Sequence, residues 1–89
     1  MNALSSRVEH RIKYTITEEF QIPAYLLHTE TVFKEDLGFD DTDMLFLSLA
    51  LEDEFEFLFT EDLQVEEMND LIKLVIAQLR KTYLNPTTN

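Results

Sequence analysis

The densest group of chemically active side chains in this sequence is a cluster of carboxylates within nine positions: Glu35, Asp36, Asp40, Asp41 and Asp43. Carboxylate oxygens are the ligands that Ca²⁺ and Mg²⁺ prefer in proteins. The spacing does not follow the D-x-D-x-D-G order of an EF-hand loop, and the closing Glu of that loop is missing. We therefore expect no dedicated metal site, and only weak cation binding that relieves repulsion among the carboxylates.

Catalytic chemistry has no support elsewhere in the sequence. The chain has no cysteine, which removes thiolate zinc sites, thiol nucleophiles and disulfides. His10 and His28 stand alone, without the spacing of a metal-binding pair. No Ser–His arrangement and no glycine-rich phosphate loop can be read from the sequence. These observations predict a protein that is not an enzyme and has no catalytic residue.

Charge is both strongly negative and concentrated. Acidic residues outnumber basic ones 18 to 7, which gives a net charge of −11 at pH 7. Positions 35–72 hold 14 Asp or Glu and no Lys or Arg. Such a run is usually a solvated face, but it would also dock a basic patch and speed association with it. Because this charge repels nucleic-acid phosphates and anionic lipid, we expect a basic protein surface as partner, and neither nucleic acid nor membrane.

Length and composition indicate one small helical domain. The chain has 89 residues, 45% of them hydrophobic, which is enough for a single core. One Gly and two Pro are too few turn residues for an all-β fold. The first residues, MNALSSRVEH, lack the apolar segment of a secretory signal, and no apolar run approaches the ~20 residues that span a bilayer. Together with the absence of cysteine, this leads us to expect a cytoplasmic protein.

Three amphipathic helices are predicted, because apolar residues recur every three or four positions in three segments. The first begins near Ser6, which forms an S-x-x-E capping box with Glu9, and it ends before Pro23. The second runs from about residue 41 to 55, and the last from about residue 65 to 83. Stripes of this kind favour an all-α, antiparallel bundle, with residues 1–84 as a single domain and residues 85–89 as a frayed tail.

The connecting segments complete the predicted bundle. A long loop follows the first helix, and its apolar residues should pin it to the core: Tyr25, Leu26, Leu27, Val32 and Phe33. Gly38 is the single glycine and is expected where other residues avoid the backbone conformation. Asp40 is a good N-cap for the second helix. In the connector at 56–64, Thr60 is a plausible cap for one short helical turn, so we expect three main helices and one short one.

The second helix carries more apolar surface than one core face requires. We assign one stripe to the core: Met44, Leu47, Ser48, Leu51 and Phe55. Leu45, Phe46 and Leu49 then point elsewhere, followed on that side by Glu52, Asp53 and Glu56. In one interpretation the long first loop, with Leu27 and Phe33, covers this second face. In the other, it is an exposed apolar patch rimmed by acid, which marks a site for a partner or for self-association.

Several segments resemble the acyl carrier protein family. They are Phe33-x-Glu35-Asp36-Leu37-Gly38-x-Asp40 before the second helix, and Asp43 with Ala50-Leu51-Glu52-x-Glu54-Phe55 within it. Arg7-Val8-Glu9, the acidity and the long first loop are also typical of the family, and the resemblance covers roughly residues 5–83. It implies a four-helix bundle that carries acyl intermediates on a 4′-phosphopantetheine arm. In the family that arm is attached to a serine in an Asp-Ser-Leu motif at the start of the second helix.

This sequence departs from the family at the attachment position itself. Asp40-Asp41-Thr42 stands where the resemblance implies Asp-Ser-Leu, so Asp41 replaces the serine. Attachment forms a phosphodiester through a hydroxyl oxygen, which a carboxylate does not provide, and an ionised Asp41 repels the pyrophosphate of coenzyme A. Thr42 is turned away by about 100° in a helix, and Ser48 lies two turns further on. We therefore expect no cofactor, and we regard Thr42 and Ser48 as weak substitutes.

Asp41 itself allows two interpretations. It suits a helix N-terminus and so fits drift after loss of the carrier role, or its charge crudely mimics a phosphorylated serine. We favour the first. The sequence thus predicts a non-catalytic, acyl-carrier-like module that binds a basic protein surface, with enzymes of fatty-acid, polyketide or related acyl metabolism as candidate partners. One alternative is a working carrier, either modified at a non-standard hydroxyl or binding an acyl ligand noncovalently, and 4′-phosphopantetheine is its cofactor if the carrier alternative holds. Another is an acidic decoy for a basic protein.

Overall fold

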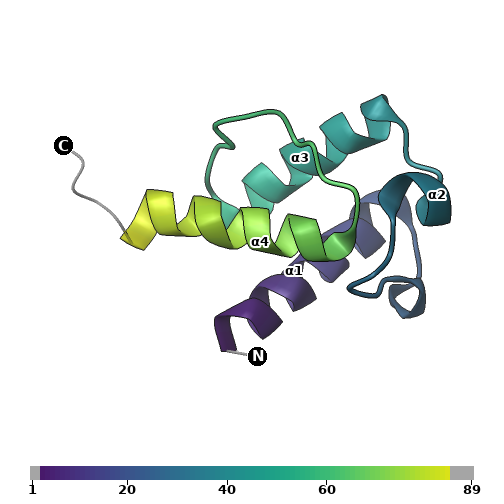
Figure 1. Ribbon diagram of the computed structural model, residues 1–89, viewed down its shortest axis with the longest axis horizontal. Helices are drawn as coiled ribbons and strands as arrows, with labels where there is room; N and C mark the ends of the chain where they lie inside the picture. The colour runs from purple at the N-terminus through teal and green to yellow at the C-terminus, as the bar shows by residue number, and fades with distance from the viewer. Residues whose placement is uncertain (1–2, 85–89) are drawn as a thin grey trace.

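The computed structural model describes residues 3–84, and within that range the protein is a bundle of four α-helices without a β-strand (Figure 1). The helices are α1 (Ala3–Phe20), α2 (Phe33–Leu37), α3 (Asp41–Phe55) and α4 (Met68–Leu79). A 3₁₀ turn, η1 (Ala24–Leu26), follows α1, and a π-helical segment, η2 (Arg80–Leu84), continues α4. The predicted all-α bundle is confirmed. The tail predicted to fray, residues 85–89, lies outside the described residues.

The core is built from one stripe on each long helix. α1 contacts both α3 and α4, so its buried face lies at the centre of the bundle. The stripes contain residues spaced three and four apart, as amphipathic helices require. The innermost side chains are Val8, Ile12 and Ile16 on α1, Leu47 and Leu51 on α3, and Met68, Leu71 and Val75 on α4. Within residues 3–84, no helix is both long enough and apolar enough to cross a bilayer.

The first loop is held to the bundle by fewer side chains than predicted. Leu27 and Phe33 are buried, but Tyr25 and Leu26 are exposed, so that part of the prediction is wrong. Backbone hydrogen bonds replace the missing apolar contacts: the amide of Phe33 donates to the carbonyl of Glu66 at 2.9 Å. The loop is therefore hydrogen-bonded to the segment at the start of α4.

The short helix lies in this loop, and not in the connector at 56–64 where we expected it. A local hydrogen bond stabilises the start of α2: the Oδ2 of Asp36 accepts from the amide of Val32 at 2.7 Å. Gly38 ends the helix with φ = +71°, the left-handed conformation predicted for the single glycine.

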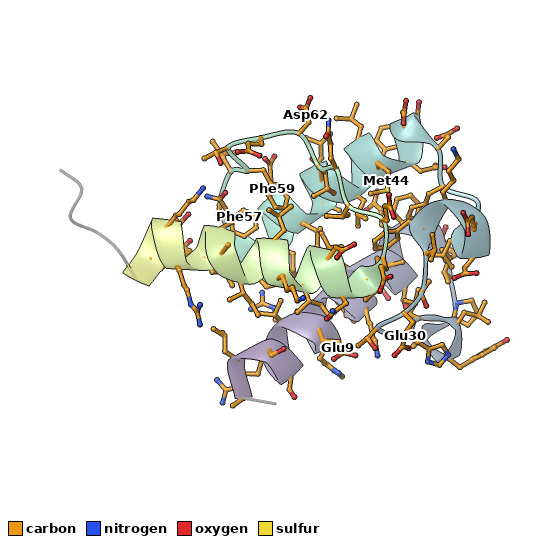
Figure 2. All side chains as sticks on the ribbon, viewed as in Figure 1. Glu9, Glu30, Met44, Phe57, Phe59 and Asp62 are labelled. Atoms are coloured by element: carbon orange, nitrogen blue, oxygen red, sulfur yellow. The ribbon has the colours of Figure 1, made fainter. Side chains whose placement is uncertain are left out.

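The connector after α3 stays irregular, and its large side chains alternate between the inside and the outside of the bundle. Phe57 is buried, Leu58 is exposed and Phe59 is half-buried (Figure 2). The ring of Phe57 lies 5.8 Å from that of Phe55 and 4.9 Å from that of Phe59, measured between centroids. Such alternation suits an extended segment and opposes a helical turn capped by Thr60.

Two predicted helix starts are also corrected. α1 is already helical at Ala3, so Ser6 lies within the helix and does not begin it with a capping box. α4 begins at Met68 rather than near Val65, because Glu67 is extended and pairs with Val32 in an isolated antiparallel bridge. The amide of Glu67 donates to Oδ2 of Asp70 at 3.2 Å, which supports the start of α4.

Candidate functional site: the outer face of α3 and the groove beside it

The start of α3 is set by local hydrogen bonds around Asp40, the N-cap that the sequence predicts. Asp40 is the N-cap: its Oδ1 accepts from the amide of Asp43 at 2.9 Å, and Oδ2 of Asp43 accepts from the amide of Asp40 at 3.0 Å. This reciprocal capping box places Asp41 and Thr42 in the exposed first turn. The predicted bounds of this helix, residues 41 and 55, are confirmed.

Hydrogen bonding to the ionised form favours the charged state of Asp40. The amide of Asp43 makes the largest contribution, and it lowers the pKa of Asp40 below its ordinary value. The cap is therefore a carboxylate at neutral pH, and it adds a fixed negative charge at the helix N-terminus.

The outer face of α3 carries an exposed apolar patch. Leu45, Phe46 and Leu49 are 56%, 50% and 52% exposed, whereas Leu47 and Leu51 on the opposite face are fully buried. Leu27 and Phe33 are packed into the core and do not cover the patch. Within the described residues this face therefore has no covering element, so the interpretation in which the first loop covers it is wrong.

Acidic side chains flank the patch at both ends of α3. Asp41 lies exposed at the start of the helix, and Asp53 and Glu56 lie exposed near its end. Glu52 is half-buried because its Oε2 accepts a hydrogen bond from the amide of Phe59 at 2.9 Å. Glu56 takes a left-handed conformation with φ = +57°, which turns the chain out of the helix. The predicted rim is thus partly structural, since Glu52 also anchors the connector.

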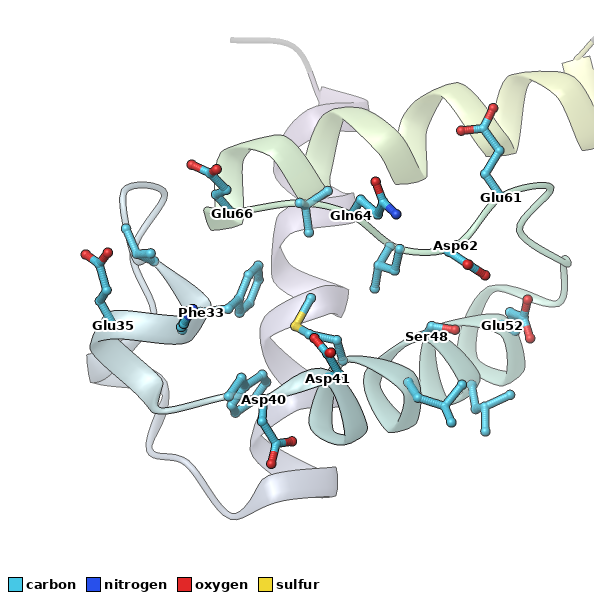
Figure 3. Close-up of a pocket in the computed structure, with 18 residues that line it drawn as sticks. Phe33, Glu35, Asp40, Asp41, Ser48, Glu52, Glu61, Asp62, Gln64 and Glu66 are labelled. Carbon is cyan, nitrogen blue, oxygen red and sulfur yellow. The ribbon is translucent and has the colours of Figure 1, made fainter.

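A groove of about 940 Å³ runs beside the patch, between α2, α3 from Asp41 to Glu52 and the connector at 61–66 (Figure 3). Its apolar lining includes Leu45 and Leu49 from the patch, and the buried Phe33 lies at its base. Seven carboxylates line it against one cation, Lys34. The carboxylates are Glu35, Asp40, Asp41, Glu52, Glu61, Asp62 and Glu66.

The site residues predicted from the sequence do not all meet here. Five of the eleven predicted residues lie outside the groove lining: Asp36, Asp43, Phe46, Asp53 and Glu56. Asp36 and Asp43 are engaged in hydrogen bonds at helix starts. Glu61, Asp62 and Glu66 line the groove although they were not singled out as site residues. The signal that could have found them is the acidic run over positions 35–72, which includes all three.

The residues at the attachment position do not fit a phosphopantetheine arm. Asp41 lines the groove but presents a carboxylate, which lacks the hydroxyl oxygen that a phosphodiester needs. Thr42 is exposed and is not part of the groove lining. Ser48 does line the groove, half-buried and two helical turns beyond Asp41. Six further carboxylates surround the groove and would repel an incoming phosphate.

Metal binding has no stronger support in the structure. Among residues 3–84, no group of three or more His, Cys, Asp or Glu side chains is arranged to hold a metal ion. Asp40 and Asp43, at the start of α3, each use one carboxylate oxygen to accept a hydrogen bond from a backbone amide.

A helical bundle with an acidic second long helix and a long loop after the first matches the architecture that the resemblance implies, and sequence comparison identifies the family. The chain is 32% identical over 71 residues to acyl carrier protein 3 of Ralstonia nicotianae, which covers 78% of this chain and 82% of that protein. It is also 32% identical over 68 residues to the acyl carrier protein of Buchnera aphidicola, covering 76% of this chain and 84% of that one. No family model matches the chain. The chain belongs to the acyl carrier protein family, as the sequence resemblance implies.

Proposed function

We propose that this protein is a non-catalytic member of the acyl carrier protein family that acts as a protein-interaction module through α3. One observation carries the proposal: Leu45, Phe46 and Leu49 stay about half exposed in the centre of a helix whose ends are acidic. An apolar centre with a charged rim is the usual anatomy of a protein-binding surface. Asp41 at the attachment position separates this role from that of a phosphopantetheine-bearing carrier.

The charge distribution favours a basic partner over a second copy. If two α3 helices packed antiparallel, Asp41 and Asp43 of one copy would face Asp53 and Glu56 of the other. Like charges opposite one another destabilise such a pair, whereas a basic surface gains both attraction and faster encounter. An enzyme of acyl metabolism is a candidate partner by family analogy alone.

The experiment that tests the absence of the arm is an intact-mass measurement. The protein purified from its own host is weighed, and then weighed again after incubation with a phosphopantetheinyl transferase and coenzyme A. We expect an unmodified mass in both cases. The matched variant is Asp41→Ser, which restores a hydroxyl at an exposed position and costs only about 0.3–1 kcal/mol of helix-dipole stabilisation.

If Asp41→Ser gains the mass of one arm while the wild-type chain does not, the enzyme recognises the domain and Asp41 alone prevents loading. If the wild-type chain gains that mass, the protein is a working carrier, and fragmentation must then choose between Thr42 and Ser48.

The interaction role is tested by partner capture from the native host with Phe46→Glu. We expect this variant to lose the captured partner. Tyr25→Glu is the matched control, because Tyr25 is 76% exposed and lies on η1, away from the patch. Equal losses in the two variants would refute a specific role for α3. Capture that collapses with salt but ignores Phe46→Glu would support the decoy alternative instead.

A further inference from the structure

A second groove is lined by residues from the start of α1, the end of α3, the end of α4 and the segment that continues α4. Figure 1 shows the start of α1 and the end of α4 on the side of the bundle away from α2. Its volume is about 690 Å³, within the range of about 300–1,000 Å³ that is typical of small-molecule sites. Apolar side chains make its floor: Leu4 and Val8 from α1, Phe55 from the end of α3, and Leu79 from α4. Tyr83 lies at its edge, and its hydroxyl donates to the carbonyl of Glu56.

The charge of this groove is the reverse of that of the rest of the molecule. The described residues that line it include Arg7, His10 and Arg11 and no Asp or Glu. By contrast, the groove beside α3 is lined by seven carboxylates, and two smaller depressions, one beside the start of α4 and one at the end of α3, are lined by three each. In a chain of net charge −11, this is therefore the apolar depression that suits an anion.

The two arginines have different roles in this groove. The Nη2 atom of Arg11 donates to Oε2 and to the backbone carbonyl of Glu54, both at 2.8 Å, and its guanidinium lies 4.9 Å from the ring centroid of Phe55. Arg11 is thus held against the groove wall with its charge paired. Arg7 is exposed and forms no ion pair with any residue of the described range 3–84, which leaves its guanidinium available to a ligand.

We propose that this groove binds a single-chain amphiphile with a carboxylate head. The apolar chain would lie on Leu4, Val8 and Leu79, and the carboxylate would take the forked donors of Arg7. One unpaired cation matches one negative charge, whereas each further charge on a ligand would meet the repulsive field of the whole chain. A monoanionic carboxylate therefore fits better than a phosphate ester. The proposal is independent of the role proposed for α3, because the two grooves share no lining residue.

The test is a titration of the ¹⁵N-labelled protein with decanoate, kept below its micellar concentration, with backbone amide shifts as the readout. We expect saturable shifts confined to residues 4–11, Phe55 and residues 79–83. Decylammonium has the same chain with the opposite charge, and we expect it to leave those residues unshifted. Shifts that centre on residues 41–52, no saturable shift, or equal binding of decylammonium at this end would each overturn the proposal.

Two charge-reversal variants separate a local contact from a general charge effect. Arg7→Glu and Lys34→Glu change the net charge equally and both alter exposed side chains, but Lys34 lies in the other groove. We expect Arg7→Glu to weaken decanoate binding at least about fivefold, the effect of losing one exposed ion pair and adding repulsion. We expect Lys34→Glu to change it less than about twofold. Equal effects of the two variants would show that no specific contact with Arg7 exists.

Discussion

Leu47 and Leu49 lie two residues apart on α3, and truncating each to alanine should lower the stability of the fold by very different amounts. Leu47 is 0% exposed and belongs to the core, whereas Leu49 is 52% exposed in the apolar patch. The chemical change is the same in both variants, and alanine preserves the helix. Any difference in stability therefore measures which face of α3 the fold uses.

The size of the difference follows from burial. Removing a fully buried leucine side chain loses its transfer free energy and leaves a cavity, which together cost about 2.7–5.0 kcal/mol in core positions. A domain of 89 residues is stable by about 4–13 kcal/mol in total, so Leu47→Ala removes a large share. Leu49→Ala gives up at most half of the transfer term, which is under about 1 kcal/mol, and it leaves no cavity.

The assay is urea unfolding followed by far-UV circular dichroism. With a slope of about 1.5 kcal/mol/M, a loss of about 3 kcal/mol lowers the midpoint of Leu47→Ala by about 2 M. The midpoint of Leu49→Ala should fall by less than about 0.7 M, with the slope unchanged in both variants. The same Leu49→Ala protein should capture less partner than the wild type.

Equal midpoint losses in the two variants would refute the reasoning. That result would mean that the outer face of α3 is packed against something in the folded protein, and the patch could not be the surface that meets a partner.

Three further predictions concern the segments that position α3. The amide of Asp43, above all, lowers the pKa of Asp40. The ionised cap therefore stabilises the fold above the unfolded-state pKa, and this stabilisation is lost as the pH falls through the folded-state pKa. The melting temperatures of wild type and Asp40→Asn should differ at neutral pH and converge below about pH 4. Gly38→Ala should cost about 1–2 kcal/mol in urea unfolding, from backbone strain alone, because no atom lies within 4 Å of the added Cβ; a negligible loss would contradict the left-handed conformation. Thr31 is buried, and its Oγ1 accepts from the amide of His28 at 2.7 Å and donates to the carbonyl of Leu26 at 3.2 Å. Thr31→Val should therefore cost about 1–3 kcal/mol of unfolding free energy. An unchanged urea midpoint would show that these bonds are not formed.

The two grooves carry opposite charge. The groove beside α3 has seven carboxylates, and the groove between α1 and α4 has two arginines and, among its described lining residues, no carboxylate. A positively charged partner and a negatively charged amphiphile would therefore be directed to opposite ends of the bundle. Occupancy of one groove need not exclude the other, because they share no lining residue.

Interactions within a few residues were predictable from the sequence, and α3 is the best example. Asp40 and Asp43 cap each other across three positions, so both the start of the helix and the N-cap could be read from residue types alone. Gly38 takes the left-handed conformation that a lone glycine before an N-cap suggests. One wrong prediction has a distant cause: the extended pairing of Val32 with Glu67 delays the start of α4 to Met68.

The sequence by itself determined the helical class, the family, the concentrated negative charge and the absence of a hydroxyl at Asp41, because these depend on composition and on neighbouring residues. Only the tertiary structure decided which surplus apolar surface remains open. Leu27 and Leu45 are both leucines that directly follow an apolar residue, yet Leu27 is 1% exposed and Leu45 is 56% exposed. Burial depends on which segments fold back over a side chain. Backbone hydrogen bonds join the first loop to the start of α4, so the loop lies against α4 and leaves the outer face of α3 uncovered.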